Sequence, residues 1–259
     1  MKLPLFQVDA FTSKLFAGNP AAVCPLESWL PDELLQKIAA ENNLAETAYF
    51  LREAEGYHLR WFTPGVEVDL CGHATLASAW VIMNELDKSA TTVRFRSRGG
   101  ELSVSRKGEI YTLDFPSRMP ERLSANAHLE EALGAKIVEL WGARDYMAVL
   151  ESEAAVRGLK PNMEKLRDVD RFAVIVTAGA SEYDFVSRFF APAKGVDKDP
   201  VTGSAHCTLA PFWAERLAKN PVLGYQASAR GGEVHCEVRG ERVLLSGHAV
   251  KYLEGWIFV

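Results

Sequence analysis

One block of residues occurs twice in this chain, and this repeat limits the possible folds more than any other feature. Arg60–Pro64 (RWFTP) parallels Arg188–Pro192 (RFFAP), and each is followed by a glycine-led acidic loop. An apolar segment with the pattern TLA-x-x-W comes next in both copies, at Thr75–Trp80 and Thr208–Trp213. Three matched features in the same order, about 128 to 133 residues apart, predict an internal duplication. Two similar lobes that face each other across a cleft are the expected geometry, and such clefts often bind ligands.

Strand-like and helix-like segments alternate through both copies, which predicts an α+β fold. Each copy has short strands around one apolar helix, expected at 72–86 in the first copy and from about Gly203 in the second, and few polar residues interrupt these helices. The proline-containing segment PSRMPERLSANA is the best boundary. We therefore predict an N-terminal lobe at 1–117 and a C-terminal lobe at 118–246, with 247–259 as a candidate final strand of the first lobe.

The charge balance excludes several classes of partner. The 259 residues include 29 Lys and Arg against 34 Asp and Glu, a formal net charge of -5. This leaves no basic excess for a nucleic acid or an anionic membrane, and no uncharged run approaches the roughly 18 residues of a membrane span. The four cysteines lack CxxC spacing, which argues against a disulfide scaffold or a structural zinc site. Reduced thiols predict a cytoplasmic protein.

Each copy leads from a loop acid, Asp69 or Asp199, into the start of its apolar helix. Helix N-termini present unpaired N–H groups and a positive partial charge, so Gly72 and Gly203 with their next residues predict two anion-binding ends. A small carboxylate-bearing molecule would suit them. The alternative is structural: glycine permits a tight entry and the polar side chains cap the helix.

Four ordered motifs resemble the PhzF-like family, which is named for phenazine biosynthesis and lies in the diaminopimelate epimerase fold superfamily. They are FQVDAFTSKLFAGNPAAV, NNLAETAYF, RWFTP-x-x-EVDLCGHATLA and DPVTGSAHCTLAPFW, and the resemblance extends to the C-terminal strands. It implies two pseudo-symmetric lobes, each a barrel-like β-sheet wrapped around a central helix, with the active site between them. It also implies a homodimer, no metal and no organic cofactor.

The resemblance assigns roles to four residues. The acid of the NNLAET motif, Glu46, is the implied catalytic acid/base, and its apolar sequence neighbours suit a carboxyl group that takes and returns a proton. His73, from GHAT, could shuttle protons or bind a substrate carboxylate. Asp199 could be a second acid/base or orient His73, and Ser204 could add a hydrogen-bond donor for an anion. Without the motifs, each of these residues has an ordinary structural interpretation at a strand or helix start.

Two further positions are candidates for substrate contact. Asn19, in AGNPAAV, lies in a motif whose loop borders the site in this family. Cys71 precedes Gly72, near one of the two positions where diaminopimelate epimerase carries its opposed thiols. The matching place before Gly203 is Thr202, whose hydroxyl cannot replace a thiolate. This departure disfavours two-thiol racemisation.

The sequence thus predicts a cofactor-independent isomerase of a biosynthetic type that moves a proton within a small carboxylate-bearing metabolite and shifts a double bond. One alternative is an epimerase or racemase of an amino-acid-like substrate that uses Cys71. Another is a metabolite-binding or interaction protein that has lost turnover. The sequence does not name the substrate.

Overall fold

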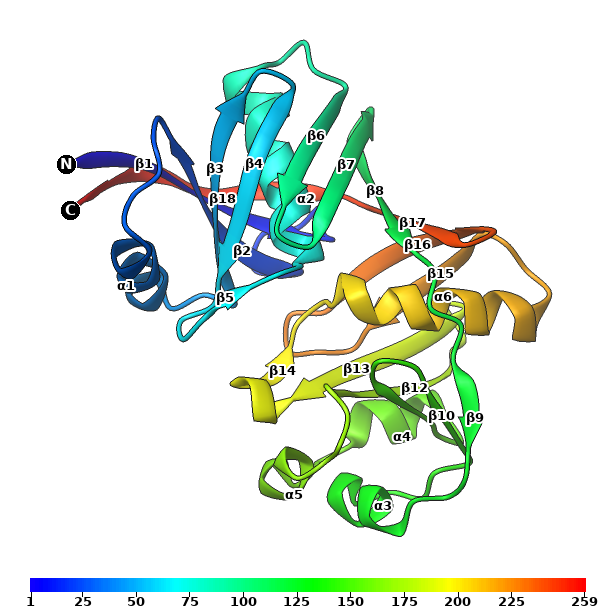
Figure 1. The fold of residues 1–259 in the computed structure, drawn as a ribbon. Helices are drawn as coiled ribbons and strands as arrows, with labels where there is room; N and C mark the ends of the chain where they lie inside the picture. Colours follow the sequence, from blue (N-terminus) through cyan, green and yellow to red (C-terminus); the bar gives the residue numbers. More distant parts are fainter. The chain divides into compact units, whose positions relative to one another are not determined.

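The structure, a computed structural model, describes residues 1–259 and divides into two compact units. Unit 1 comprises residues 1–114 and 246–259, and unit 2 comprises residues 115–245. The chain leaves unit 1 within β8 (Ile110–Pro116) and returns within β17 (Arg242–Gly247). Both units combine a large sheet with few helices, so the predicted α+β class is confirmed (Figure 1).

In unit 1 the strands pair in the order β18-β1-β2-β3-β4-β6-β7-β8, and the two-residue strand β5 also pairs with β4. The pairs β2·β3 and β4·β6 are parallel and the others are antiparallel. The first and last strands of the chain therefore lie side by side (Figure 1). The remaining elements of unit 1 are β1 (Lys2–Ala10), β2 (Asn19–Leu26), α1 (Asp32–Asn42), β3 (Glu46–Glu53), β4 (Gly56–Phe62), β5 (Glu67–Val68), α2 (Gly72–Val81), η1 (Ile82–Leu86), β6 (Thr92–Ser97), β7 (Gly100–Lys107) and β18 (Ala249–Phe258).

In unit 2 the strands pair in the order β9-β10-β11-β12-β13-β15-β16, with β14 also on β13. Here β11·β12 and β13·β15 are the parallel pairs. The elements of unit 2 are β9 (Glu121–Leu123), α3 (Ala127–Leu133), β10 (Glu139–Gly142), β11 (Tyr146–Val149), α4 (Glu153–Gly158), α5 (Met163–Arg167), β12 (Val174–Gly179), β13 (Phe185–Ala191), η2 (Pro192–Lys194), β14 (Val196–Asp199), α6 (Gly203–Leu217), β15 (Val222–Gln226) and β16 (Gly232–Arg239).

The two sheets repeat one pattern of pairing. From β1 to β7 the directions run antiparallel, parallel, antiparallel, parallel, antiparallel, and from β10 to β16 they run in the same order. The repeated motifs occupy equivalent places, since RWFTP begins in β4 and RFFAP in β13, while the two TLA-x-x-W patterns lie in α2 and α6. Equivalent positions in the two units can therefore be compared residue by residue.

Helices cover these sheets. In unit 1, α2 packs against β1, β2 and β3, and nearly all its residues are buried. Its small residues, such as Ala74 and Ala77, permit this close approach to the strands. Helix α1 contributes Leu35 and Ile38 to another apolar cluster, which also contains Tyr49 of β3. In unit 2, α6 packs against β15 and β16, while α3, α4 and α5 contribute to a separate apolar cluster with β12 and β13.

The predicted helix at 72–86 differs from the structure in its last turn. The α-helix ends at Val81, and Ile82–Leu86 continue as a π-helix in which the Asp87 N–H donates to the Ile82 carbonyl at 2.7 Å. A π-helical turn contains more residues than an α-helical turn. The 3.6-residue apolar period of the sequence does not indicate this change of helix type. No helix here combines the length and apolar character needed to cross a membrane.

Candidate active site

The strongest candidate site lies in unit 1, where three elements begin. The parallel strands β2 and β3 start at the same edge, with Ala21 opposite Glu46. Asn19 is the first residue of β2 and Glu46 the first of β3. Helix α2 packs against both strands and begins at Gly72, so His73 is also brought to this edge. Parallel pairing thus collects polar residues that are 27 or more positions apart in the sequence.

His73 is at the centre of this group. Its Nε2 lies 3.1 Å from Oε2 of Glu46, although the two groups are not aligned as a hydrogen bond. Its Nδ1 lies 3.1 Å from the Asn19 side-chain nitrogen and 3.5 Å from the Cys71 sulfur. When the imidazole is neutral, Nδ1 accepts from the Asn19 amide N–H and the proton resides on Nε2; when it is charged, both ring nitrogens are donors and the Asn19 amide turns its oxygen to Nδ1.

Exposure distinguishes the two partners of the acid–imidazole pair. The Glu46 side chain is 14% exposed and the His73 side chain only 4%. Within unit 1, Glu46 is therefore the member that a small molecule can reach, with His73 behind it. This order suits a carboxyl group that meets the substrate and an imidazole that supports its charge.

The surrounding charges act on both ionisable neighbours of Glu46. Burial alone opposes a charge on His73, but the Glu46 carboxylate 3.1 Å away, with the Cys71 sulfur beside the ring, outweighs it and raises the pKa of His73 above its usual value. Burial, followed by the nearby Glu46 charge, raises the pKa of the Cys71 thiol to about 11. At neutral pH the site therefore holds a thiol rather than a thiolate.

Glu46, Cys71 and His73 also form the one cluster of potential metal ligands, with ligand atoms within 4.8 Å of one another. A carboxylate, a thiolate and an imidazole are a donor set that zinc accepts. Binding would require the Cys71 thiol to lose its proton and the Glu46–His73 contact to open around the ion. The same three side chains already contact one another directly, which suits an acid/base pair.

The other predicted residues lie in unit 2, around the start of α6. The Thr202 hydroxyl donates to the Asp199 carboxylate at 2.6 Å. Gln226, which is 1% exposed, accepts from the Thr202 N–H and donates to the Asp199 carbonyl, each at 2.8 Å. Ser204, the second residue of α6 after Gly203, accepts a hydrogen bond from Arg144 at 3.2 Å. Neither α2 nor α6 has an N-cap side chain that accepts a hydrogen bond from its first turn.

Comparison of the two repeats shows that only the first has the acid. Ala48 pairs with Trp61, and Ile175 pairs with Phe189, the repeat counterpart of Trp61. Counting back two residues in each strand, Glu46 corresponds to Ala173, a methyl group. Counted from the glycine that begins each helix, His73 corresponds to Ser204 and Cys71 to Thr202, whereas the TLA-x-x-W pattern aligns His73 with His206. The second repeat therefore lacks the carboxyl group, and the imidazole of its helix, His206, is fully buried with Nδ1 2.8 Å from the Thr202 carbonyl oxygen.

The structure thus brings Asn19, Glu46, Cys71, Gly72 and His73 together in unit 1, and Asp199, Gly203 and Ser204 together in unit 2. Asn19, predicted as a substrate contact, is fully buried and bonds to His73. Sequence reasoning missed two residues of unit 2, Gln226 and Arg144. Their segments carry no repeated or spaced pattern, so no signal in the sequence could have identified them.

The fold has relatives among isomerases and epimerases. A hydroxyproline epimerase from Agrobacterium vitis, solved with bound trans-4-hydroxy-L-proline, superposes with a TM-score of 0.63 over 99% of this chain and 91% of that one. At 11% identity this similarity concerns the fold alone. It defines the class as α+β proteins with an isomerase- and epimerase-type fold.

The chain belongs to the family described as phenazine biosynthesis-like protein, whose sequence pattern matches residues 8–255. An uncharacterized isomerase of Pseudomonas aeruginosa is 51% identical over 255 residues, which cover 98% of each chain. A crystal structure of a PhzF-family phenazine biosynthesis protein from Enterococcus faecalis is 46% identical, with a TM-score of 0.97 over the whole of both chains. The resemblance inferred from the sequence motifs is confirmed.

Proposed function

We propose that this protein is a cofactor-independent isomerase that moves a proton within a small carboxylate-bearing metabolite and so shifts a double bond. One observation carries the proposal: a partly exposed Glu46 carboxyl group lies 3.1 Å from the buried His73 imidazole, and the equivalent position of the other repeat is alanine. A single acid/base group suits removal and return of a proton on one face of the substrate. The isomerase names of the relatives support the same class of reaction.

The proton balance needs only one group. Glu46 as carboxylate takes a proton from an acidic carbon next to an unsaturated system, and the electron pair of the broken C–H bond moves into that system. Glu46 as carboxylic acid then returns the proton to another carbon, and the double bond shifts. His73 stabilises the carboxylate before and after each transfer, and Asn19 holds the ring through Nδ1.

The residues of unit 2 are assigned to the same reaction as part of this proposal. Asp199 is a second acid/base or substrate-orienting group, and Ser204 with Gly203 and Gly72 contributes donors for the substrate carboxylate. The uncapped starts of α2 and α6 support this role, because unpaired N–H groups at a helix start favour an anion. Loss of turnover in Asp199→Asn, with the fold retained, tests the assignment.

The direct test is a metabolite screen in deuterated water. Wild-type protein should introduce deuterium into one carboxylate-bearing compound and change the position of its double bond, as detected by mass spectrometry and proton NMR. The same compound incubated with Glu46→Gln should stay unlabelled. Affinity for the compound without any exchange in the wild type would overturn the proposal in favour of a binding protein.

One observation favours an epimerase as a second candidate: Cys71 lies 3.5 Å from His73 Nδ1 and could exchange a proton with it. Two facts weigh against it. The Cys71 thiol holds its proton at neutral pH, since its pKa is raised to about 11, and Thr202 replaces a second thiol. Inversion at a single labelled carbon that is abolished in Cys71→Ser would favour the epimerase.

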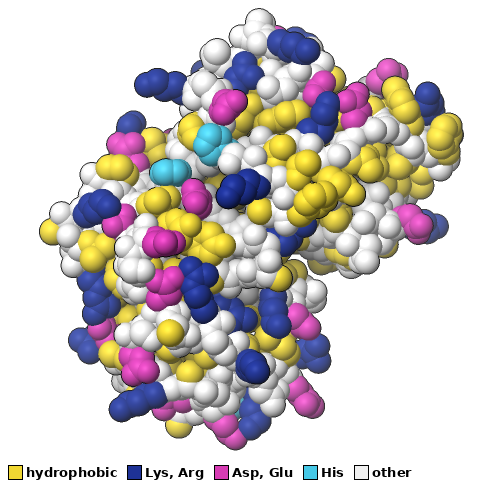
Figure 2. Space-filling model, turned by 180° about the vertical axis from the view of Figure 1, so that it is seen from behind, with side chains coloured by type: hydrophobic (Ala, Val, Ile, Leu, Met, Phe, Trp, Pro, Cys, Tyr) yellow, Lys and Arg dark blue, Asp and Glu magenta, His cyan; other side chains and the backbone are white.

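We also propose a homodimer and a cytoplasmic location. The last strand of unit 1, β18, exposes large apolar side chains, with Trp256 at 56% and Phe258 at 78% exposure. Hydrophobic side chains gather near the chain termini in Figure 2, whereas acidic and basic side chains are interspersed over the same face. Such an apolar area suits a partner of the same chain. The cytoplasmic proposal is supported by four cysteines that are buried and free.

A further inference from the structure

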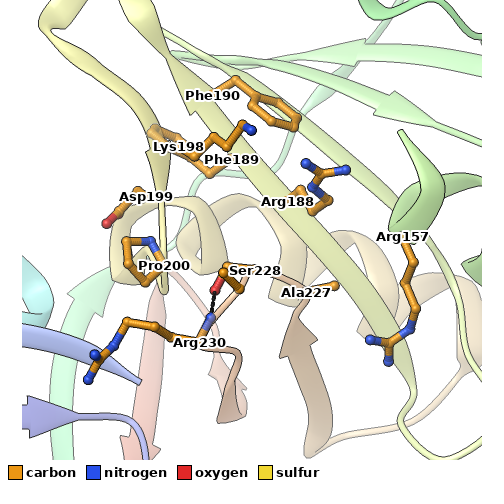
Figure 3. A pocket seen from close by; sticks show the side chains of 11 residues that line it. Arg157, Arg188, Phe189, Phe190, Lys198, Asp199, Pro200, Ala227, Ser228 and Arg230 are labelled. Atoms are coloured by element: carbon orange, nitrogen blue, oxygen red, sulfur yellow. Dashed lines mark hydrogen bonds between the residues drawn. The ribbon is translucent and has the colours of Figure 1, made fainter. Parts of the chain in front are cut away.

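Unit 2 contains a pocket of about 550 Å³, and of the residues that line it the proposed proton transfer uses only Asp199. Strand β13, the end of β14 and the segment after β15 line it, together with one residue of α4 (Figure 3). Its volume falls within the roughly 300–1,000 Å³ of small-molecule sites. The four basic side chains that line it are Arg157, Arg188, Lys198 and Arg230, against the single acid Asp199.

Strand alternation separates these charges between two faces. Asp199 pairs with Phe189, so both lie on one face of the sheet. The alternate positions, on the other face of the sheet, are occupied by Lys198 in β14 and by Arg188 and Phe190 in β13. Arg157 reaches the pocket from α4. The carboxylate of Asp199, moreover, accepts from the Thr202 hydroxyl. Three cations thus lie on the face of β13 that is opposite to the acid.

Arg188 is the residue that most needs an explanation. It is half-buried, and its Nη1 donates to the carbonyls of Val156 at 3.1 Å and Leu159 at 2.7 Å, at the end of α4. No carboxylate contacts its guanidinium group, and burial lowers the pKa of Arg188. The two carbonyls fix one nitrogen, which leaves other N–H groups of the rigid fork to bind a ligand.

In the first repeat the equivalent arginine is paired with carboxylates. Arg60, the counterpart of Arg188, makes two hydrogen bonds to the Glu67 carboxylate at 2.7 and 2.9 Å and a third to Asp32 at 2.9 Å. Asp197, the counterpart of Glu67, is exposed and lies 3.8 Å from Arg167 instead. The second repeat therefore has the equivalent half-buried guanidinium group without carboxylate partners.

We propose that this pocket binds a small dianion, a phosphate or a dicarboxylate, through Arg188 and Lys198, with Arg157 at its rim. A planar guanidinium group binds two oxygens of such an anion at once, and a nearby ammonium group adds a second charge. Arg157 is shared with Glu153, at 2.7 Å, so it contributes less. None of these three cations takes part in the proton transfer assigned to Glu46; Asp199, on the other face, is the one lining residue that the two proposals share.

Isothermal titration calorimetry with inorganic phosphate and, separately, with malonate at constant ionic strength tests this. One of the two should bind wild type saturably, and the tighter one identifies the phosphate or the dicarboxylate class. Arg188→Gln should weaken that binding by about tenfold or more, and Lys198→Gln by roughly three- to tenfold. Lys198 is exposed, so its variant tests the site even if Arg188→Gln fails to fold.

Two controls make the result specific. Lys136→Gln removes one exposed positive charge of unit 2 outside the pocket and should leave binding unchanged. Glu46→Gln should also bind normally, which separates this site from the proposed isomerase reaction. The absence of saturable binding of both anions to wild type, or equal losses in Lys198→Gln and Lys136→Gln, would overturn the proposal.

Discussion

Replacing Glu46 with glutamine should abolish most turnover while leaving the fold intact. The amide keeps nearly the same shape but cannot take a proton from carbon at neutral pH. General acid/base catalysis by a positioned side chain contributes about 10²- to 10⁴-fold, so the rate of deuterium exchange into the substrate should fall by that factor. Glu41→Gln, which changes an exposed glutamate at the end of α1, is the matched control and should retain the wild-type rate.

The distance between Glu46 and His73 also determines how much the Glu46→Gln substitution should lower the free energy of unfolding. Coulomb's law with an effective dielectric constant of about 20 gives roughly 5 kcal/mol for unit charges 3.1 Å apart, before the desolvation of both groups is subtracted. Removing one partner of a buried pair typically costs about 3–5 kcal/mol when the other must stay charged. His73 can instead release its proton. We therefore expect the free energy of unfolding at pH 7 to fall by only about 1–2 kcal/mol.

The measurement combines exchange kinetics with chemical denaturation and an NMR titration of His73. The pKa of His73 should fall in Glu46→Gln, because a negative charge that raises it is gone. Exchange in Glu46→Gln within about threefold of wild type would refute the assignment of Glu46 as the acid/base. A pKa of His73 that does not move would refute the electrostatic coupling of the pair.

Further expectations concern the neighbours of this pair. The pKa of His73 is raised above 6.5 in the folded protein, so protonated His73 should stabilise the fold fully below about pH 6.5. This stabilisation should decline as the pH rises through the pKa of His73 in the folded protein. Denaturation curves measured from pH 5 to 10 test this. Cys71→Ser should keep the exchange rate within a few-fold of wild type, and a loss of activity above a hundredfold would favour the epimerase. Iodoacetamide should modify Cys71 of the wild type slowly, because the thiol is buried and protonated. Asn19→Ala should lower the exchange rate by about tenfold and shift its pH profile, as it removes the hydrogen bond to Nδ1; an unchanged profile would contradict a positioning role. Chelation with EDTA should leave exchange unchanged, whereas added zinc should inhibit it by competing for Glu46, Cys71 and His73; activity lost to EDTA and restored by zinc would contradict a metal-free reaction.

The sequence predicted the class of fold because the repeated motifs mark equivalent elements. RWFTP and RFFAP enter equivalent strands, and the two apolar helices follow them in both units. Composition and alternation do not reveal that β2 and β3 are parallel, because a strand's apolar pattern does not encode the direction of its neighbour. That pairing places the starts of both strands at one edge, where the packing of α2 brings His73 to Asn19, so the contact became visible only in three dimensions.

For the site, residue types were predictable and their relations were not. Glu46 was identified by resemblance to a family motif, since on its own it is a glutamate at the start of a strand. Its 3.1 Å approach to His73 depends on how α2 packs on the sheet, which no local pattern fixes. Gln226 is invisible for the same reason: its hydrogen bonds to Thr202 and Asp199 span more than 20 residues of sequence.

The duplication explains how one chain can carry two different kinds of site. The apolar residues that build each sheet are similar in pattern, so they hold the same strand order, while polar residues at the strand ends can differ without cost to the core. At one such position the first repeat has the Glu46 carboxyl and the second has a methyl group. At another, the first repeat neutralises Arg60 with two carboxylates and the second leaves Arg188 with backbone carbonyls alone. Because the shared scaffold fixes where these side chains emerge, a few substitutions suffice to give one unit a carboxyl–imidazole pair and the other a cationic pocket.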